Sequence, residues 1–430
     1  MKKEGFLMNY KKEDIKQGIA FHKINTNKFK TNLFAIFLST KLDRETVTKN
    51  ALLTSVLRRG SKNYPTQDLI SKNLEKMYGA SFECGVEKTG DNHILKFYLE
   101  SINNEFLPTE ENLSKECLDI LLDIIFNPFV ENGQFKDEYV NGEKENLKQI
   151  IEGKIDNKAR YASERCIEEM YKNEPYGLYK FGYIEDLEKI TSKDLYEYYL
   201  EVVKNAKIDI FVSGQLDNNI INELKENEII KTLNERQPLY NVNKENDLKE
   251  KVDEPKIVDE SMQITQGKLI LGLDVLDNKK ETKYATSVYN VILGGSANSK
   301  MFQNVREKAS LAYTAGSVYL RQKDNIFVKC GIDIPNYEKA VEIIKEQLKQ
   351  MLDGDFDNED IDNAKLLISS SVGSIPETQD SEITYYFAQE LSDDFVSIED
   401  YIKKINEVTK EQILEVAKNI QINTIYFLKD

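Results

Sequence analysis

The sequence predicts an α+β protein with two homologous αβ domains, each a mostly antiparallel sheet packed by helices. Three observations indicate this class. Predicted strands are joined by hairpins, with helices grouped between them, which favours an antiparallel sheet covered on one face. The same order of elements occurs twice along the chain. The chain has 430 residues, more than one compact core usually holds.

The first copy begins with the apolar run Asn32–Ser39, which is too short for a helix and predicts a buried strand. A helix follows over Asp43–Leu57, where apolar residues recur every three to four positions, and Gly60 marks its end. A second helix is predicted from about Thr66 to Tyr78, before Gly79.

A hairpin is predicted next, because Ala80–Val86 and Ile94–Ser101 alternate in polarity around the turn-rich stretch Lys88–Asn92. Helical spacing then returns over Leu113–Phe126 and ends before a proline. The first copy closes with long helices between Phe135 and about Met170 and with a strand over Ile208–Ser213.

The second copy repeats this order. Its predicted elements are a strand at Leu269–Leu273, a helix at Tyr284–Leu293, a hairpin of Ala312–Leu320 and Ile326–Ile332 across Arg321–Asn325, and a helix at Val341–Leu352 stopped by Gly354. The clearest echo pairs Gly90–Lys96 with Lys323–Lys329, and Asn103 is echoed by Asn336 at the same shift. Two copies of one αβ unit therefore form the chain.

A charged segment separates the copies. Asn241–Glu260 contains eleven charged residues and Pro255, a composition that buries little apolar surface. We therefore expect an N-terminal domain over residues 1–230, a linker over 231–262 and a C-terminal domain over 263–430. Charge clusters such as Lys244–Glu250 are interpreted as solvated faces.

The overall charge limits the partners that the protein can bind. With 74 acidic and 58 basic residues, the net charge is −16, which disfavours nucleic acid and anionic membrane surfaces. No apolar run is long enough for a membrane span, and the first residues do not resemble a signal peptide. We therefore expect a cytoplasmic protein.

Cysteine and histidine offer little metal chemistry. The four cysteines, Cys84, Cys117, Cys166 and Cys330, are spaced for neither a disulfide scaffold nor a thiolate metal site, so reduced buried thiols are expected. The only histidines, His22 and His93, are too far apart to bind a metal as a helical pair. Both are interpreted as structural or surface imidazoles, and no cofactor is expected.

The predicted helix over Asp43–Leu57 and the turn after it carry a family resemblance. From Ala51 the segment reads Ala51-Leu-Leu-Thr-Ser-Val-Leu-Arg-Arg-Gly-Ser61, and with the duplicated pattern it resembles the insulinase-like (pitrilysin) zinc metallopeptidases. That family has His-x-x-Glu-His on this helix. The resemblance places Ala51, Thr54 and Ser55 at the first ligand, the general base and the second ligand.

None of these three residues can supply that chemistry. A methyl group has no lone pair for zinc, and neutral hydroxyls are weak ligands that cannot accept a proton from metal-bound water as a glutamate does. The resemblance places the third ligand near Glu143–Ile150, and the alignment puts Ile150 at the ligand itself. We therefore expect no zinc, and no peptidase activity from this chain alone.

The second copy matches the family better. Gly294-Gly295, followed by Arg306-Glu-Lys-Ala-Ser-Leu-Ala-Tyr313, looks like the family's glycine-rich segment and its Arg and Tyr pair. The resemblance implies that Arg306 and Tyr313 bind the substrate backbone and the oxyanion of the tetrahedral intermediate. The alternative is that Arg306 pairs with acids such as Glu307 while Tyr313 fills core space. The two glycines alone are equally typical of a helix stop, and they lack the ending of a phosphate-binding loop.

The resemblance implies a division of labour. Some branches of the family pair a subunit that bears the metal motif with one that bears the Arg and Tyr pair, and this sequence looks like the second kind. We therefore expect a metal-bearing homologous partner and a peptide or protein substrate. Within the family, the chain is most similar to bacterial proteins associated with aminopentanol modification of elongation factor P. A non-catalytic binding or scaffold protein is the alternative, whereas a self-sufficient peptidase would need a metal site that the sequence does not show.

Overall fold

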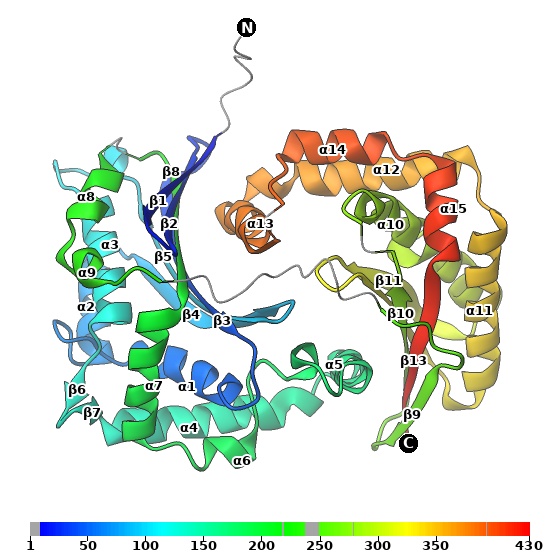
Figure 1. The fold of residues 1–430 in the computed structure, drawn as a ribbon, viewed down its shortest axis with the longest axis horizontal. Helices are drawn as coiled ribbons and strands as arrows, with labels where there is room; N and C mark the ends of the chain where they lie inside the picture. Colours follow the sequence, from blue (N-terminus) through cyan, green and yellow to red (C-terminus); the bar gives the residue numbers. More distant parts are fainter. Residues whose placement is uncertain (1–8, 217–218, 237–248, 278, 393) are drawn as a thin grey trace, which may run out of the picture. The chain divides into compact units, whose positions relative to one another are not determined.

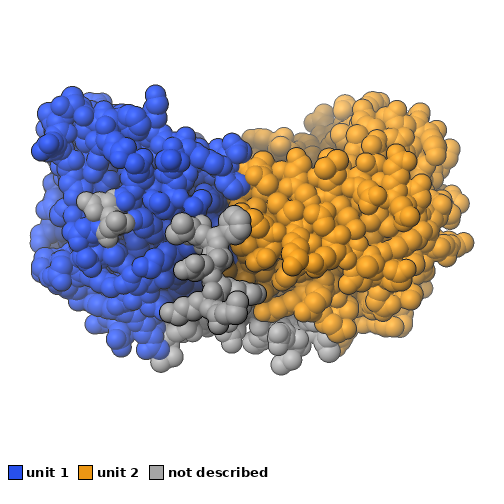
Figure 2. Space-filling model, turned by 90° about the horizontal axis from the view of Figure 1, so that it is seen from above, with its two compact units in different colours: residues 1–152, 178–242, 376–391 blue, residues 153–177, 243–375, 392–430 orange. Residues whose placement is uncertain are grey.

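The computed structural model describes residues 9–216, 219–236, 249–277, 279–392 and 394–430 (Figure 1). The chain forms two compact units, which Figure 2 colours separately. Unit 1 takes residues 1–152, 178–242 and 376–391, and unit 2 takes residues 153–177, 243–375 and 392–430. Each unit therefore contains a segment from the opposite half of the sequence.

Unit 1 is built on a six-stranded sheet in the order β1-β2-β8-β3-β5-β4. Neighbouring strands are antiparallel except β2 and β8, which are parallel. The strands are β1 (Tyr10–Lys16), β2 (Ile19–Asn25), β3 (Thr31–Lys41), β4 (Ser81–Thr89), β5 (Asn92–Ile102) and β8 (Lys207–Gly214). The hairpin of β4 and β5 confirms the predicted one, and β3 and β8 confirm the predicted strands.

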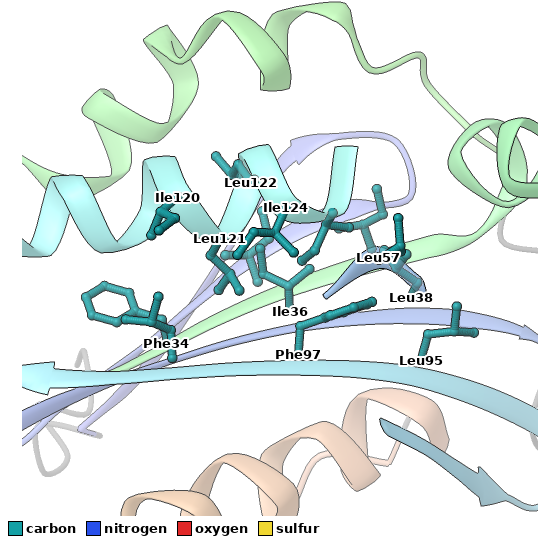
Figure 3. Close-up of a cluster of buried hydrophobic side chains, with 14 of the residues drawn as sticks. Phe34, Ile36, Leu38, Leu57, Leu95, Phe97, Ile120, Leu121, Leu122 and Ile124 are labelled. Carbon is teal, nitrogen blue, oxygen red and sulfur yellow. The ribbon is translucent and has the colours of Figure 1, made fainter. Parts of the chain in front are cut away.

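Helices and the sheet of unit 1 enclose its main core. The helices are α1 (Val47–Leu57), α2 (Gln67–Lys76), α3 (Leu113–Phe126), α4 (Asp137–Glu152), α6 (Ile184–Leu187), α7 (Ser192–Asn205), α8 (Ile220–Glu226) and α9 (Glu228–Thr232), and β6 (Val130–Glu131) pairs with β7 (Gln134–Phe135) in a short ribbon. Figure 3 shows Phe34, Ile36 and Phe97 of the sheet directed toward Leu121 and Ile124 of α3. All five side chains are buried, so α3 takes its position from this apolar contact.

The other face of this sheet is also covered, which corrects the expectation of a sheet covered on one face only. Helix α13 (Gln379–Ser392), from the C-terminal half of the sequence, packs there. Its Phe387 ring stacks on Phe37 at 4.0 Å between centroids, and Tyr386 stacks on Tyr10 at 4.2 Å. Because β3 is apolar on both faces, it required a cover on both sides.

Unit 2 has a five-stranded sheet in the order β11-β12-β10-β13-β9. Its strands are β9 (Lys256–Ser261), β10 (Gly267–Val275), β11 (Ala312–Leu320), β12 (Asn325–Ile332) and β13 (Ile420–Lys429). Its helices are α10 (Thr282–Asn290), α11 (Tyr337–Asp353), α12 (Asn358–Gly373), α14 (Ile398–Asn406) and α15 (Lys410–Lys418), with π-helical segments η4 (Val291–Gly295) and η5 (Met301–Lys308). Helix α5 (Lys158–Met170), from the N-terminal half, packs on this sheet through Ala162 and Cys166.

The topology confirms the internal duplication. Strands β4, β5, β3, β8 and β2 of unit 1 have the same order as β11, β12, β10, β13 and β9 of unit 2. The one parallel pair also recurs, as β2 with β8 and as β9 with β13. The α+β class with two homologous, mostly antiparallel sheets packed by helices is therefore confirmed.

Three details differ from the sequence predictions. The first helix begins at Val47 rather than Asp43, with Thr46 as its N-cap residue. Lys256–Ser261 form strand β9, although they were assigned to the linker over 231–262. Lys249, expected on a solvated face, is mostly buried and pairs with Asp274 at 3.2 Å. Residues 244–248 of that charged cluster lie outside the described part of the chain.

The predicted domains, residues 1–230 and 263–430, are each one continuous segment. In the structure, by contrast, unit 1 also contains α13 and unit 2 also contains α5. Short-range patterns cannot detect such an exchange, because each helix is amphipathic wherever it packs. Among the described residues, no helix is long and apolar enough to cross a membrane.

Candidate functional site

Helix α1 carries the residues that align with the zinc motif, and its chemistry is that of a packed helix. Ala51 is 3% exposed and belongs to the main core of unit 1. The Thr54 hydroxyl is buried and donates to the carbonyl of Ala51 at 2.9 Å, within its own helix. Ser55 is half-buried. The first-ligand position, Ala51, is thus apolar, and the hydroxyl at the general-base position, Thr54, is bonded to the helix backbone.

The position predicted for the third ligand is also unsuited to a metal. Ile150 lies on α4 with 45% of its surface exposed, and it offers no donor atom. Two helical turns earlier on α4, Glu143 is buried, and its Oε1 lies 3.3 Å from Nη1 of Arg59. Asn146 also donates to Glu143 at 3.1 Å. The buried carboxylate of Glu143 therefore has cationic and amide partners supplied by the protein.

Arg59 was not singled out by the sequence analysis. It follows the end of α1, its guanidinium lies 5.4 Å from the centroid of the Tyr139 ring, and its Nη1 also lies 3.4 Å from Oε1 of Gln67. The sequence shows a cation after α1 and an acid on α4, but only the packing of the two helices brings Arg59 and Glu143 together. Within the described residues, no group of three or more His, Cys, Asp or Glu side chains is arranged to hold a metal ion.

In unit 2, the glycine-rich segment is explained by close packing. A Cβ atom on Gly294 would lie 2.5 Å from the backbone nitrogen of Ser317 on β11, which is a steric clash. The Ser317 hydroxyl donates to Oδ1 of Asn290 at 2.8 Å. Gly294 is therefore required where η4 approaches β11, rather than only as a helix stop.

Arg306 lies on η5, which is anchored by the buried side chains of Met301 and Val305. Its side chain is 41% exposed, with Nε 3.7 Å from Oε1 of Glu307, and its guanidinium lies 4.4 Å from the centroid of the Phe302 ring. The contact with Glu307 is long and solvent-exposed, so it stabilises little. The guanidinium remains accessible to a ligand.

Tyr313 lies on β11 at an irregularity in the sheet. The pairing of β11 with β12 shifts between Ala312 and Thr314, which leaves Tyr313 as the extra residue of a β-bulge. Its side chain is 64% exposed, so the alternative in which it fills core space is wrong. A bulge redirects a side chain, and such redirection is frequent beside functional sites.

The structure places these residues in two groups. Ala51, Thr54 and Ser55 share one helix of unit 1, whereas Arg306 and Tyr313 lie in unit 2, on η5 and β11. In chemical terms, the first group offers no metal ligand, and the second offers an exposed guanidinium and an exposed phenol.

The two histidines are buried and hydrogen-bonded, which confirms their structural interpretation. His22 contacts the Tyr10 hydroxyl through Nδ1 at 2.8 Å and Asp209 through Nε2 at 3.1 Å. Burial alone would raise the pKa of the Asp209 carboxyl, but Lys207 and His22 hold it below its usual range. His93 receives a hydrogen bond from Asn50 at 3.0 Å, and burial lowers its pKa to about 4. The four cysteines are free thiols, and burial raises the pKa of the least buried, Cys84, to about 11.

Comparison with known proteins agrees with this geometry. The family described as the peptidase M16 inactive domain matches residues 189–368. The "Probable inactive metalloprotease YmfF" of Bacillus subtilis is 36% identical over 413 residues, which cover 96% of each chain. The chain belongs to the M16 peptidase family. It is an inactive metallopeptidase homologue, and the predicted insulinase-like resemblance is confirmed.

Solved structures extend this M16 assignment to the fold. A conserved protein from Enterococcus faecalis V583 is 29% identical, with a TM-score of 0.88 over 98% of each chain. A peptidase M16 inactive domain from Pseudomonas fluorescens has a TM-score of 0.78 at 17% identity, also over 98% of each chain.

A further relative found by sequence is the uncharacterized zinc protease YmxG of Bacillus subtilis. It is 22% identical over 71% of this chain and 72% of its own.

Proposed function

We propose that this M16 chain is the zinc-free subunit of a cytoplasmic heterodimer. In this proposal it pairs with a metal-bearing homologue, binds an extended peptide and completes the partner's active site with Arg306 and Tyr313. The observation that carries the proposal is a contrast between the two units. On α1, a methyl group stands where the first ligand would be, and a hydroxyl bonded to the helix backbone stands where the general base would be. In unit 2, the Arg306 guanidinium and the Tyr313 phenol are exposed.

The edge of the sheet in unit 2 supports peptide binding. Within the described residues, β11 has a strand neighbour on one side only, so it can accept a further strand by backbone hydrogen bonding. Ala312–Leu320 contains no charged residue. The other three edge strands of the two large sheets all carry charges, which discourage such pairing: β1 has Lys11, Lys12, Glu13, Asp14 and Lys16, β4 has Glu83, Glu87 and Lys88, and β9 has Lys256, Asp259 and Glu260.

The chemistry of the exposed pair suits an assisting role. A guanidinium and a phenol are hydrogen-bond donors that can stabilise the oxyanion of a tetrahedral intermediate formed on a partner's metal. Loss of one such donor typically lowers the rate by about a hundredfold or more. Neither residue can supply the nucleophilic water or the general base, so activity requires a second subunit.

The test is a reconstitution. This chain is mixed with a homologue from the same genome that retains His-x-x-Glu-His, and cleavage of a peptide library is followed with each protein alone and with the mixture. We expect cleavage in the mixture only. Arg306→Ala and Tyr313→Phe should each lower kcat, with association unchanged. Lys308→Ala is the matched control, because Lys308 is exposed on the same segment η5.

Full activity of both variants in an intact complex would contradict the catalytic half of the proposal. The scaffold alternative predicts a different partner: a homologue that has also lost the zinc motif, with no cleavage by the mixture. The association with elongation factor P stays a prediction of the resemblance. It is checked by measuring aminopentanol modification in cells that lack this chain.

A further inference from the structure

Unit 2 contains two cations, Arg321 and Lys404, that have no carboxylate partner among the residues that the structure describes. The guanidinium of Arg321, in the turn between β11 and β12, lies 4.8 Å from the centroid of the Tyr284 ring and 5.2 Å from that of the Tyr401 ring. The ammonium of Lys404, on α14, lies 5.1 Å from the same Tyr284 ring. Two cations therefore share one aromatic ring of α10. Helices α10 and α14 are neighbours in this unit (Figure 1).

Two acids of this unit, Asp324 and Asp394, are paired with other cations. Asp324 accepts from the Tyr319 hydroxyl at 2.6 Å and lies 3.3 Å from Lys283. Asp394 lies 3.5 Å from Lys280. Among the residues that the structure describes, no carboxylate oxygen lies within 4.0 Å of the charged nitrogens of Arg321 or Lys404.

The hydrogen bonds of these two cations go to tyrosine hydroxyls rather than to carboxylates. Arg321 has five N–H donors, and its Nη1 donates to the Tyr401 hydroxyl at 3.2 Å. Lys404 donates to the Tyr284 hydroxyl at 3.3 Å. Arg321 also hydrogen-bonds to the Tyr284 side chain, and it is only half-buried, so part of the side chain reaches solvent.

Two like charges that contact the same aromatic ring favour an anion. Partial burial against aromatic rings reduces the hydration of the guanidinium, and repulsion between the cations adds to the cost. An oxyanion would relieve both, because it can accept from the guanidinium fork and from the ammonium together. This concentration of positive charge is unusual in a chain with a net charge of −16.

We propose that Arg321, Lys404 and the hydroxyls of Tyr284 and Tyr401 form an oxyanion-binding site for a carboxylate or a phosphate group. The site lies within unit 2 and is separate from Arg306 and Tyr313. It does not depend on the proposed peptidase partnership. A carboxylate would come from an acidic side chain or chain end of a bound protein, and a phosphate from a free or attached phosphoryl group.

The site is tested on the full chain by thermal unfolding. Inorganic phosphate and glutarate are titrated in separate series, with total ionic strength held constant by sodium chloride. Binding to the folded state raises Tm saturably and gives an apparent Kd. We expect Lys404→Gln to weaken binding about tenfold or more, because it removes a charge-assisted contact.

Lys403→Gln is the matched control: it makes the same charge change one residue earlier on α14, where Lys403 lies 4.0 Å from Glu407. It should leave the apparent Kd unchanged. Arg321→Gln should abolish saturation, and if that variant unfolds, Lys404→Gln still decides. Saturation with phosphate alone or with glutarate alone identifies the ligand class. No saturable rise with either ion, or equal Kd values for Lys404→Gln and Lys403→Gln, would overturn the proposal.

Discussion

Asn50 shows how α1 is held in place without a metal. Its side chain donates to Thr40 at 2.9 Å and to His93 at 3.0 Å, and it accepts from the Tyr198 hydroxyl at 2.9 Å. These contacts connect α1 with β3, β5 and α7. The adjacent Ala51 packs into the apolar core, so polar and apolar contacts together fix the helix.

Restoring an imidazole at position 51 should be costly. Ala51→His inserts a large polar ring into a packed core, and we expect the free energy of unfolding to fall by about 1–3 kcal/mol. Ser55→His, at a half-buried position, should cost less. Chemical denaturation of both variants measures the difference. If Ala51→His were as stable as the parent chain, the core around position 51 would have room for an imidazole, and this prediction would be wrong.

His93 should make stability depend on pH. Its pKa is about 4 in the folded chain, against about 6.5 when unfolded. Between these values the unfolded chain binds the extra proton, so stability falls as pH drops from about 6.5 to about 4 and no further below. The expected loss is about 3 kcal/mol. His93→Gln should remove this part of the pH dependence, measured as the difference between the two unfolding curves at pH 7 and pH 4.

At the scale of elements, α13 is attached to the first sheet by an ion-pair network as well as by aromatic packing. Oε1 of Glu390 lies 2.7 Å from Nζ of Lys12 on β1 and 2.8 Å from Nζ of Lys207 on β8. In unit 2, Glu260 of β9 binds Arg165 of α5 at 3.0 Å and accepts from Tyr426 at 2.9 Å. Both exchanged helices are therefore held by a glutamate with several partners.

Neutralising Glu390 should loosen α13. In Glu390→Gln, the mostly buried ammonium of Lys207 keeps only Asp209, at 3.3 Å, as a carboxylate partner among the described residues. We expect a loss of about 1–3 kcal/mol, because a partly buried charge loses a partner. Amide hydrogen exchange over residues 379–392 should accelerate.

The matched control for this change is Glu377→Gln. Glu377 is exposed and lies 3.4 Å from Lys28, which is also exposed. Because solvent screens such a pair, the expected change is below about 0.5 kcal/mol. A similar effect of the two substitutions would show that α13 is held by its aromatic contacts alone.

At the scale of the whole molecule, each half of the sequence completes the other half's unit. Unit 1 needs residues 376–391, and unit 2 needs residues 153–177. A fragment from either half alone would leave one apolar sheet face, with residues such as Phe211 or Tyr426, open to water.

Fragments 1–242 and 243–430 should therefore fold together but not separately. Each expressed alone should aggregate or bind a hydrophobic dye, whereas co-expression should give a complex of both fragments with the circular dichroism spectrum of the intact chain. Light scattering and co-purification through a tag on one fragment measure this. Two stable, non-associating fragments would show that neither exchanged helix is required for folding.

Local patterns in the sequence were sufficient for most elements. The strands β3, β4, β5, β10, β11 and β12 and the helix α3 depend on short-range alternation, helical spacing and turn residues, which act within a few positions of the chain. The loss of zinc chemistry was equally local, because Ala51 and Ile150 lack donor atoms in any fold. The duplication was visible because corresponding elements recur in order.

Contacts between distant segments decided the rest. The exchange of α5 and α13, the ion pair of Arg59 with Glu143, the bulge at Tyr313 and the cations around Tyr284 all join residues from separate elements. These residues meet because the apolar faces of their elements are buried against one another. That burial minimises the apolar surface exposed by a whole unit, so it depends on segments far apart in the sequence. Periodicity shows that a helix has an apolar face, but only packing selects the sheet which that face covers.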